Sequence, residues 1–439
     1  MAREKTIVEV IPSAKRLIGS LRDVGYDFVH AVADLVDNSI EARAGRVDIK
    51  MEFDAEDSWI RIVDDGTGMS GTIINEAMRF GTEREYELDE LGRFGLGLKT
   101  ASLSQCSRLT VASRINPDMR RIEVRQWDLD YVEETNRWVI INVPPEERPD
   151  YLVTPLQRRT GTVVLWEQLD RVLGYKIPWG ERARSGFFSL ADDLDQHLGM
   201  VFHRFLTGEA RRRKKLTITI NGTPVEPWDP FAREEKATDE LPGYEFEITG
   251  DDGPGLVGYS PYILPPQDKF SSLQAFNHYA GPGKWNYQQG FYIYRADRMI
   301  QSGGWCRMRT SDEHTKLARV ALDFRPDLDS AFDMNVAKAR INLPADLRIQ
   351  LKPYVEKIVK KARKAYTPDG GGSSGSGSGT SGAGHTCSTG GAAGSSSVKS
   401  YIGDAIEDAA GKADELPGLK KIKKVLRTEN PDTSREIGW

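Results

Sequence analysis

Cysteine is scarce in this sequence, and long uncharged apolar runs are missing from it. The 439 residues include three cysteines, Cys106, Cys306 and Cys387, at separations that suit neither a metal site nor a disulfide framework. No run has the length of charge-free residues that a membrane-spanning helix needs, and residues 1–13 lack the apolar core of a signal peptide. We therefore expect a cytoplasmic protein with no membrane association.

A strong excess of charge of one sign is also absent. The 60 Lys and Arg against 65 Asp and Glu leave a formal net charge of -5. The chain as a whole is therefore not attracted to nucleic acid or to anionic lipid, and any contact with DNA has to be local. The content of 39% hydrophobic and 28% charged residues is ordinary for a globular protein, and the length allows two or three domains.

The periodicity of apolar residues predicts helices and strands in a mixed order. Steps of three and four between residues 12 and 44 predict two helices with a break near Gly25. Alternating patterns predict strands at 47–53 and 58–63, then between 108 and 127, at 138–143 and at 162–165, with a helix at 73–80. Because this order is not a strict βαβ repeat, the fold class is α+β. The first domain is predicted to end near residue 175 or, with its helices, at 207.

A second α+β domain is predicted at 208–368, where strands come first and a helix follows at 344–366. Residues 369–397 are almost wholly Gly, Ser, Thr and Ala, which predicts a flexible linker. Residues 398–439 form a short tail, whose modest helical pattern is interrupted at Pro417. Its basic side chains are Lys420, Lys421, Lys423 and Lys424.

Three short motifs in the first domain carry chemistry. In ADLVDNSIEA (33–42), Asp34, Asn38 and Glu41 fall on one face of a helix, although a solvated polar face is the commoner reason for such a stripe. In DDGTGM (64–69), Asp64 ends a strand before a Gly turn and could accept an exocyclic amine, although ordinary turns have the same composition.

The third motif is GRFGLGLKTAS (92–102), in which glycines precede a predicted helix. Free N–H groups at a helix start favour phosphate oxygens, and Lys99 adds a positive charge. The glycine spacing is also similar to a dinucleotide fingerprint. That fingerprint belongs in the first turn of a βαβ unit, however, and the charged stretch before Gly92 does not fit such a setting.

Taken in order, these motifs and RRTGTVVLW (158–166) resemble the four ATP-site boxes of the GHKL superfamily, which includes gyrase, heat-shock chaperones, histidine kinases and MutL. The resemblance implies a Bergerat-type ATP-binding α/β sandwich at 1–207 with a lid near 81–97, and ATP and Mg²⁺ as cofactors. It also implies that Asn38 holds Mg²⁺, that Asp64 binds the adenine amine and that Thr162 supports Asp64. The other implied nucleotide contacts are Gly66, Gly68, Met69, Gly92, Arg93, Phe94, Gly95, Leu96, Gly97 and Lys99.

The resemblance continues into the second domain. GFYIYRADRMIQSGGW (290–305) and FDMNVAKARINLP (332–344) are similar to the smaller, ribosomal-protein-like transducer domain of MutL-like and MORC-like members. In that pattern a loop lysine reaches the γ-phosphate of ATP, and Lys338 holds the matching position. A solvated loop lysine is the alternative interpretation.

One residue departs from the family pattern. Members that hydrolyse ATP usually carry Glu four residues before the Mg²⁺-binding Asn, and here Asp34 stands at that position. An aspartate is one methylene shorter and has to come within reach of the proton that it takes, so we expect an ATPase with slow turnover. A contribution from Asp37 or Glu41, and ATP binding with little hydrolysis, are the alternatives.

The resemblance therefore implies a MutL-like or MORC-like clamp that closes its lid and forms a homodimer on binding ATP. Members of this group act on or near DNA, often in bacterial defence. The alternatives are a nucleotide-switched scaffold that binds a partner protein through the tail, and a chaperone-like ATPase. A histidine kinase fits poorly, because only 33 residues precede Asp34 and a phospho-accepting helical hairpin would need more.

Overall fold

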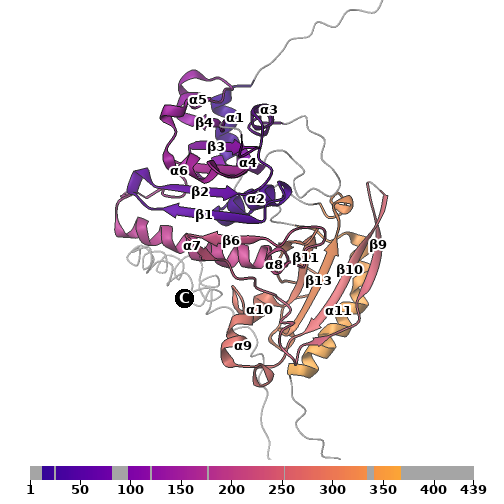
Figure 1. Cartoon of the computed structure of the whole chain (residues 1–439). Coiled ribbons are helices and arrows are strands. Elements are labelled where there is room, and N and C mark those ends of the chain that lie inside the picture. Colours follow the sequence, from indigo (N-terminus) through magenta and orange to yellow (C-terminus); the bar gives the residue numbers. More distant parts are fainter. Residues whose placement is uncertain are drawn as a thin grey trace, which may run out of the picture. The chain divides into compact units, whose positions relative to one another are not determined.

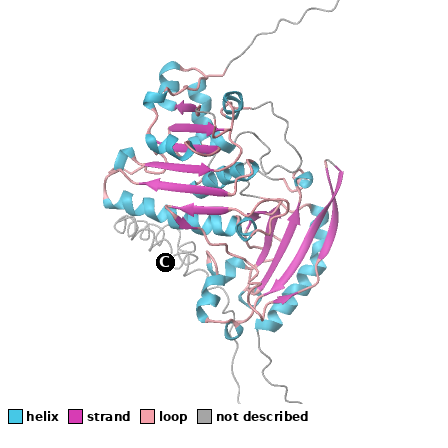
Figure 2. Cartoon of the chain, in the orientation of Figure 1, coloured by secondary structure: helices cyan, strands magenta, loops and turns pink. Residues whose placement is uncertain are grey.

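The computed structural model describes residues 12–23, 26–81, 97–118, 121–175, 177–251, 253–333 and 341–366. All of these residues belong to one compact unit, Met1–Gly371. Within this unit two β-sheets are each packed against helices (Figures 1 and 2).

The first sheet contains Asp64 and Thr162, and the helices α2 (Phe28–Glu41) and α4 (Gly97–Leu103) of the same layer carry the described residues of the other two boxes. Its strand order is β4-β3-β5-β2-β1-β6-β7, and neighbouring strands are antiparallel except for the parallel pair β1 and β6. The strands are β1 (Arg46–Glu52), β2 (Trp59–Asp64), β3 (Arg108–Arg114), β4 (Glu123–Asp128), β5 (Gly161–Glu167), β6 (Thr217–Ile220) and β7 (Thr223–Pro224). In β1, Val47, Ile49 and Met51 are buried and the residues between them are more exposed, so the strand has one apolar face.

Helices pack on that apolar face. The main core of this layer joins Val32 and Val36 of one helix to Ile49, Ile62 and Trp166 of the sheet. The helices of this part of the chain are α1 (Ala14–Arg22), α2 (Phe28–Glu41), α3 (Gly71–Ala77), α4 (Gly97–Leu103), α5 (Leu129–Thr135), α6 (Asp150–Val153), α7 (Glu181–Val201) and α8 (His203–Thr207). A smaller core on the other face of the sheet includes residues of the segment 143–156. The result is a sheet with apolar cores on both sides, an α/β sandwich.

The second sheet has the order β12-β11-β13-β10-β8, and β9 pairs with β10. Its strands are β8 (Asp239–Glu240), β9 (Tyr244–Gly250), β10 (Gly253–Ile263), β11 (Gly290–Arg295), β12 (Arg298–Gln301) and β13 (Ala318–Phe324). Helix α11 (Ala345–Tyr366) packs on it through Leu347, Leu351 and Ile358, and the short helices α9 (Leu273–Tyr279) and α10 (Lys284–Gln288) precede β11. Figure 1 shows α11 running along this sheet.

These elements confirm the α+β class and most of the predicted segments. Helices α1 and α2 begin at capping residues, because the side chain of Ser13 accepts the amide of Arg16 and that of Asp27 accepts the amide of His30. Gly25, where a break was predicted, lies outside the described residues.

Two segments differ from the sequence analysis. Residues 138–143 form no strand and contribute an isolated bridge between Ile141 and Gln126. Residues 217–224 were assigned to the second domain, but they form β6 and β7 of the first sheet. The reason is packing, because Ile218 and Ile220 are buried in the same core as Val47 and Ile49. The first sheet therefore extends beyond residue 207.

In the described part of the chain, no helix is both long enough and apolar enough to span a lipid bilayer.

Candidate functional site

Asp64 is held in one orientation at the end of β2. Its side chain is buried, and Oδ1 accepts hydrogen bonds from the amides of Gly66 at 2.8 Å and Thr162 at 3.2 Å. Burial raises the pKa of Asp64 to about 6, and the two amide donors oppose that shift. Oδ2 accepts no hydrogen bond from the described residues. One carboxylate oxygen is thus fixed by the fold and the other is available to a ligand.

Glycines let the backbone close tightly around Asp64. A Cβ on Gly161 would overlap the carbonyl oxygen of Asp64, and one on Gly68 would overlap that of Arg114. Both residues have positive φ, 138° at Gly161 and 69° at Gly68, which side chains disfavour. A Cβ on Gly66 would come within 2.7 Å of Ala42, at the end of α2. The loop after β2 therefore packs directly on both β3 and α2.

Ser113 of β3 completes this corner, and the sequence analysis missed it. Its hydroxyl is 3.0 Å from the hydroxyl of Thr162 and from the carbonyl oxygen of Gly161, and it accepts the amide of Met69 at 2.7 Å. Thr162 supports Asp64 through its backbone amide, while its hydroxyl faces Ser113. The only signal for Ser113 is its position opposite Thr162 in the β3–β5 register, which requires the strand pairing to be known.

Helix α2 presents one of its polar residues to solvent and buries two others. Asn38 is exposed, whereas Asp34 is 3% exposed and Asp37 is 1% exposed. A solvated polar stripe therefore does not account for these residues. Among the described residues no group of three or more His, Cys, Asp or Glu side chains is arranged to hold a metal. The exposed amide of Asn38 fits a Mg²⁺ ion that takes its other ligands from phosphates and water.

The carboxylate of Asp34 faces the first residue of α4. Its Oδ2 accepts the hydroxyl of Tyr26 at 2.9 Å and lies 3.6 Å from the point where Gly97 would carry a Cβ. Burial next to Asp34 raises the pKa of Tyr26 far above its usual value, so the phenol remains a donor. On the other side, Oδ1 lies 4.0 Å from Nη2 of Arg298 in β12. Neither Tyr26 nor Arg298 was identified from the sequence.

The two alternative carboxylates of α2 are engaged by arginines. Both oxygens of Asp37 accept Nε–H of Arg298, at 2.9 and 3.0 Å. Glu41 accepts Nη2 of Arg213 at 3.0 Å. Within the described part of the glycine motif, the carboxylate of Asp34 lies next to Gly97.

Lys99 lies in α4 with its side chain 1% exposed. Its ammonium donates to the carbonyl oxygen of Ala77, at the end of α3, at 3.0 Å. Burial lowers the pKa of Lys99 to about 8, and the charge of Glu76 opposes that shift. The cation is therefore close to its titration range at neutral pH. The remaining predicted site residues, Gly92, Arg93, Phe94, Gly95, Leu96 and Lys338, lie outside the described residues.

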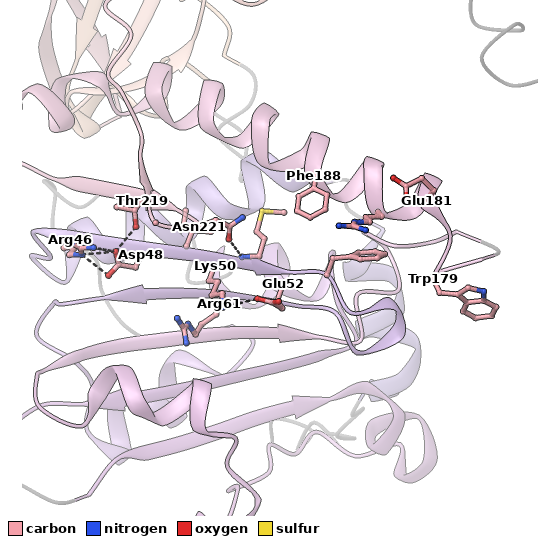
Figure 3. Close-up of a pocket in the computed structure, with 15 residues that line it drawn as sticks. Arg46, Asp48, Lys50, Glu52, Arg61, Trp179, Glu181, Phe188, Thr219 and Asn221 are labelled. Atoms are coloured by element: carbon pink, nitrogen blue, oxygen red, sulfur yellow. Dashed lines mark hydrogen bonds and ion pairs between the residues drawn. The ribbon is translucent and has the colours of Figure 1, made fainter.

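A hollow of about 970 Å³ lies elsewhere on the first sheet (Figure 3). Its wall includes Asp48 and Lys50 of β1, Asn221, and Trp179 and Phe188 near the start of α7. Asp48 is bound there by Arg46 and Thr219, and Lys50 pairs with Glu52. None of the predicted site residues lines this hollow. The candidate site comprises the corner around Asp64 and the helix α2 that carries Asn38 and Asp34, which meet where Gly66 packs on Ala42.

Comparisons with known proteins agree with this geometry. Residues 26–162 match the family described as histidine kinase-, DNA gyrase B-, and HSP90-like ATPase, and that span runs from Tyr26 to Thr162 of the site. A stretch of 88 residues is 38% identical to the DNA mismatch repair protein MutL of Tolumonas auensis. That stretch covers 19% of this chain and 15% of the MutL protein, so the likeness concerns a small part of the relative. Residues 26–162 are thus similar to the ATPases of the GHKL superfamily, and a shorter stretch of the chain is similar to MutL.

Proposed function

We propose that the protein is an ATP-binding clamp that hydrolyses ATP slowly, closes a lid near residues 81–97, forms a homodimer when ATP binds and acts on or near DNA. The observation that carries the nucleotide assignment is the corner around Asp64. A buried carboxylate with one oxygen fixed by two amides, and the other available, is suited to receive the exocyclic amine of adenine. The match of residues 26–162 to the ATPase family supports this role.

The proposed roles of the other residues are supported by the exposure of Asn38 and by the family resemblance. Asn38 would give Mg²⁺ one oxygen ligand from the exposed face of α2. Gly92 to Lys99 would surround the phosphates, as the family resemblance implies. Bound Mg²⁺ would neutralise phosphate charge and draw electron density from the terminal phosphate. Lys338, from a transducer-like second domain, would sense the γ-phosphate.

Asp34 is the proposed general base. A water oxygen forms a bond to the γ-phosphorus, the bond from that phosphorus to the bridging oxygen breaks, and Asp34 receives the proton of the water; ADP and phosphate leave. The position of Asp34 beside Gly97 supports this role. Slow turnover is expected because the side chain is short and because Oδ2 already accepts the hydroxyl of Tyr26.

Steady-state ATP hydrolysis with Mg²⁺ tests the assignment. We expect slow turnover by the unmodified chain, no nucleotide binding by Asn38→Ala, and binding without turnover by Asp34→Ala. The loss of a general base should lower kcat by roughly 10²- to 10⁴-fold. An Asp34→Ala protein with undiminished turnover would remove Asp34 from the mechanism.

The variant Asp34→Glu separates a slow ATPase from a nucleotide-switched scaffold. If the short side chain limits turnover, Asp34→Glu should hydrolyse ATP faster than the unmodified chain with similar nucleotide affinity. The engagement of Asp34 by the hydroxyl of Tyr26 favours the scaffold as the second candidate. In that case neither protein turns over ATP, although both bind it.

The DNA part of the proposal depends on local positive charge. Lys357, Lys360, Lys361 and Lys364 are exposed on α11. If they contact phosphates, affinity for duplex DNA should fall steeply between about 50 and 200 mM salt. Binding that does not change with salt would contradict a phosphate contact.

A further inference from the structure

Arg298 connects the second sheet to the helix that carries the proposed base. It is the first residue of β12, and its side chain is 2% exposed. Its Nε–H is shared by both oxygens of Asp37 in α2, 261 positions away along the chain. Its Nη1 donates to the carbonyl oxygen of Met299 at 3.2 Å. The guanidinium is thus held at two of its three nitrogens.

The third nitrogen is directed toward Asp34. Nη2 lies 4.0 Å from Oδ1 of Asp34 and is buried without a hydrogen-bond partner among the described residues. A buried donor without a hydrogen bond is unfavourable. At this distance, the favourable interaction is the Coulomb attraction between the guanidinium of Arg298 and the carboxylate of Asp34. Arg298 therefore acts electrostatically on Asp34 while it is anchored by Asp37.

Among the described residues, the printed contacts of Asp34 and Asp37 include no second buried cation. The hydroxyl of Tyr26 donates to Asp34, and the ring of Phe202 lies 5.8 Å from the guanidinium carbon. The ring of His197 in α7 lies 4.7 Å from that of His30 at an angle of 55°, and burial lowers the pKa of His197 to about 3, so it is neutral at physiological pH. His30 is partly exposed and paired with Asp27. Two buried carboxylates thus share one guanidinium.

We propose that Arg298 is a positioning residue for ATP hydrolysis, which fixes α2 through Asp37 and keeps the carboxylate of Asp34 ionised and oriented. The inference rests on the proposed ATPase function. It makes the geometry of the base depend on a strand of the second sheet. Arg298 touches neither nucleotide nor water in this role and acts through Asp34.

Electrostatics gives the proposal a specific signature. Arg298→Gln removes the cation, so the pKa of Asp34 rises and the acidic limb of the kcat profile moves to higher pH. Asp37→Asn removes the competing anion, so the pKa of Asp34 falls and the same limb moves to lower pH. A structural defect alone would not move the limb in opposite directions in these two variants.

The experiment uses the full chain and measures kcat, KM for ATP and their pH dependence. For Arg298→Gln we expect kcat at neutral pH to fall at least tenfold, KM to stay within about twofold, and part of the rate to return at higher pH. A shift of one pH unit in the limb corresponds to about 1.4 kcal/mol. Arg298→Lys keeps the charge but not the geometry, so it should lower kcat with a smaller shift of the limb.

Arg295 offers a matched control. It is as buried as Arg298 and donates to both oxygens of Asp329, at 2.6 and 2.7 Å, within the part of the chain that forms the second sheet. Arg295→Gln should lower the melting temperature as much as Arg298→Gln does and leave the acidic limb in place. Melting curves and nucleotide titrations check that each variant is folded. If Arg298→Gln does not fold, the downward shift in Asp37→Asn still tests the proposal.

Two patterns of results separate the failure of this inference from the failure of the proposed function. If the unmodified chain hydrolyses ATP and Asp34→Ala does not, but the limb stays in place in both Arg298→Gln and Asp37→Asn, then Arg298 is structural only. The same conclusion follows if Arg295→Gln changes the limb equally. If the unmodified chain does not hydrolyse ATP, or if Asp34→Ala hydrolyses it fully, the ATPase assignment itself is wrong.

Discussion

At the scale of single residues, Asp64 is a buried acid. Burial makes its charged form less favourable in the folded protein. Its pKa of about 6 lies above the ordinary value for an unfolded chain, so the folded state holds the proton more tightly. Protonated Asp64 therefore contributes to the free energy of unfolding. This contribution is complete below about pH 4 and is lost as the pH rises through about 6. A buried acid with a raised pKa is consistent with a ligand-binding role.

Asp64→Asn should therefore separate folding from binding. The amide oxygen can still accept from Gly66 and Thr162, while its NH₂ group would face the adenine amine as a second donor. We expect a melting temperature at pH 8 equal to or above that of the unmodified chain. ATP affinity should fall about 10- to 150-fold, from the loss of a charged hydrogen bond of about 1.5–3 kcal/mol. Calorimetric titration and thermal melts measure both quantities.

The neighbouring residue provides the control for that variant. Asp65 is exposed, and its Oδ1 accepts the amides of Gly45 and Arg46. Asp65→Asn should leave ATP affinity unchanged. In the unmodified chain, affinity should also decline as the pH falls through about 6, because protonated Asp64 no longer offers two acceptors. Tight binding by Asp64→Asn would show that the adenine lies elsewhere.

Lys99 permits a second test by pH. Its pKa of about 8 means that the ammonium is largely charged at pH 7 and largely neutral at pH 9. If it contributes charge to the phosphates, Lys99→Met should weaken ATP binding at pH 7 by about threefold to tenfold, for an interaction on the order of 1 kcal/mol. The difference from the unmodified chain should then shrink at pH 9. If Lys99→Met and the unmodified chain bind ATP equally at pH 7 and pH 9, Lys99 has a structural role, such as its contact with Ala77.

At the scale of elements, periodicity predicts which face of a segment is apolar but not what that face meets. Helix α2 and strands β1 and β2 were predictable because their apolar residues follow periods of about 3.6 and 2. The burial of Asp34 and Asp37 was not predictable, because tertiary packing brings them to their partners Tyr26 and Arg298. In the same way, β6 could be predicted as a strand, but its place beside β1 depends on pairing between residues far apart in the chain.

Gly161 tests whether the close approach of β5 to β2 is needed to form the site. It begins β5, and an added Cβ would overlap the carbonyl of Asp64, so Gly161→Ala should separate β5 from β2. We expect the free energy of unfolding to fall by roughly 2–4 kcal/mol, from backbone strain together with overpacking. ATP affinity should fall as well, since Thr162 then no longer orients Asp64. Denaturant unfolding and nucleotide titration measure these changes.

Gly222 is the matched control for that substitution. It also has positive φ, 88°, but nothing lies within 4 Å of an added Cβ, between β6 and β7. Gly222→Ala should lower the free energy of unfolding by about 1 kcal/mol, from the backbone conformation alone. ATP affinity should be unchanged. Similar losses in both variants would mean that the close approach at Gly161 is unimportant.

At the scale of the whole molecule, buried polar contacts join the helical layer of the first sheet to the second sheet. Arg204 of α8 forms ion pairs with Asp297 and Asp323 and lies over the ring of Tyr294. His203 is hydrogen-bonded to the hydroxyl of Tyr294 at 2.9 Å. Arg298 adds a contact from the second sheet to α2 through Asp37, so directional bonds connect the second sheet with both α8 and α2. A clamp requires this kind of connection between its nucleotide site and its moving part.

The last prediction concerns assembly, in which nucleotide binding and dimerisation are linked. If ATP binds the dimer more tightly than the monomer, a non-hydrolysable ATP analogue has to raise the dimer fraction, because binding and association share one free-energy cycle. Light scattering over a range of protein concentrations should therefore show a larger mass with the analogue than without it. Lys338→Ala should reduce that increase while leaving the analogue bound, and Asp64→Asn should show it only at about 10- to 150-fold higher analogue concentration. An unchanged mass at saturating analogue would leave a monomeric nucleotide switch.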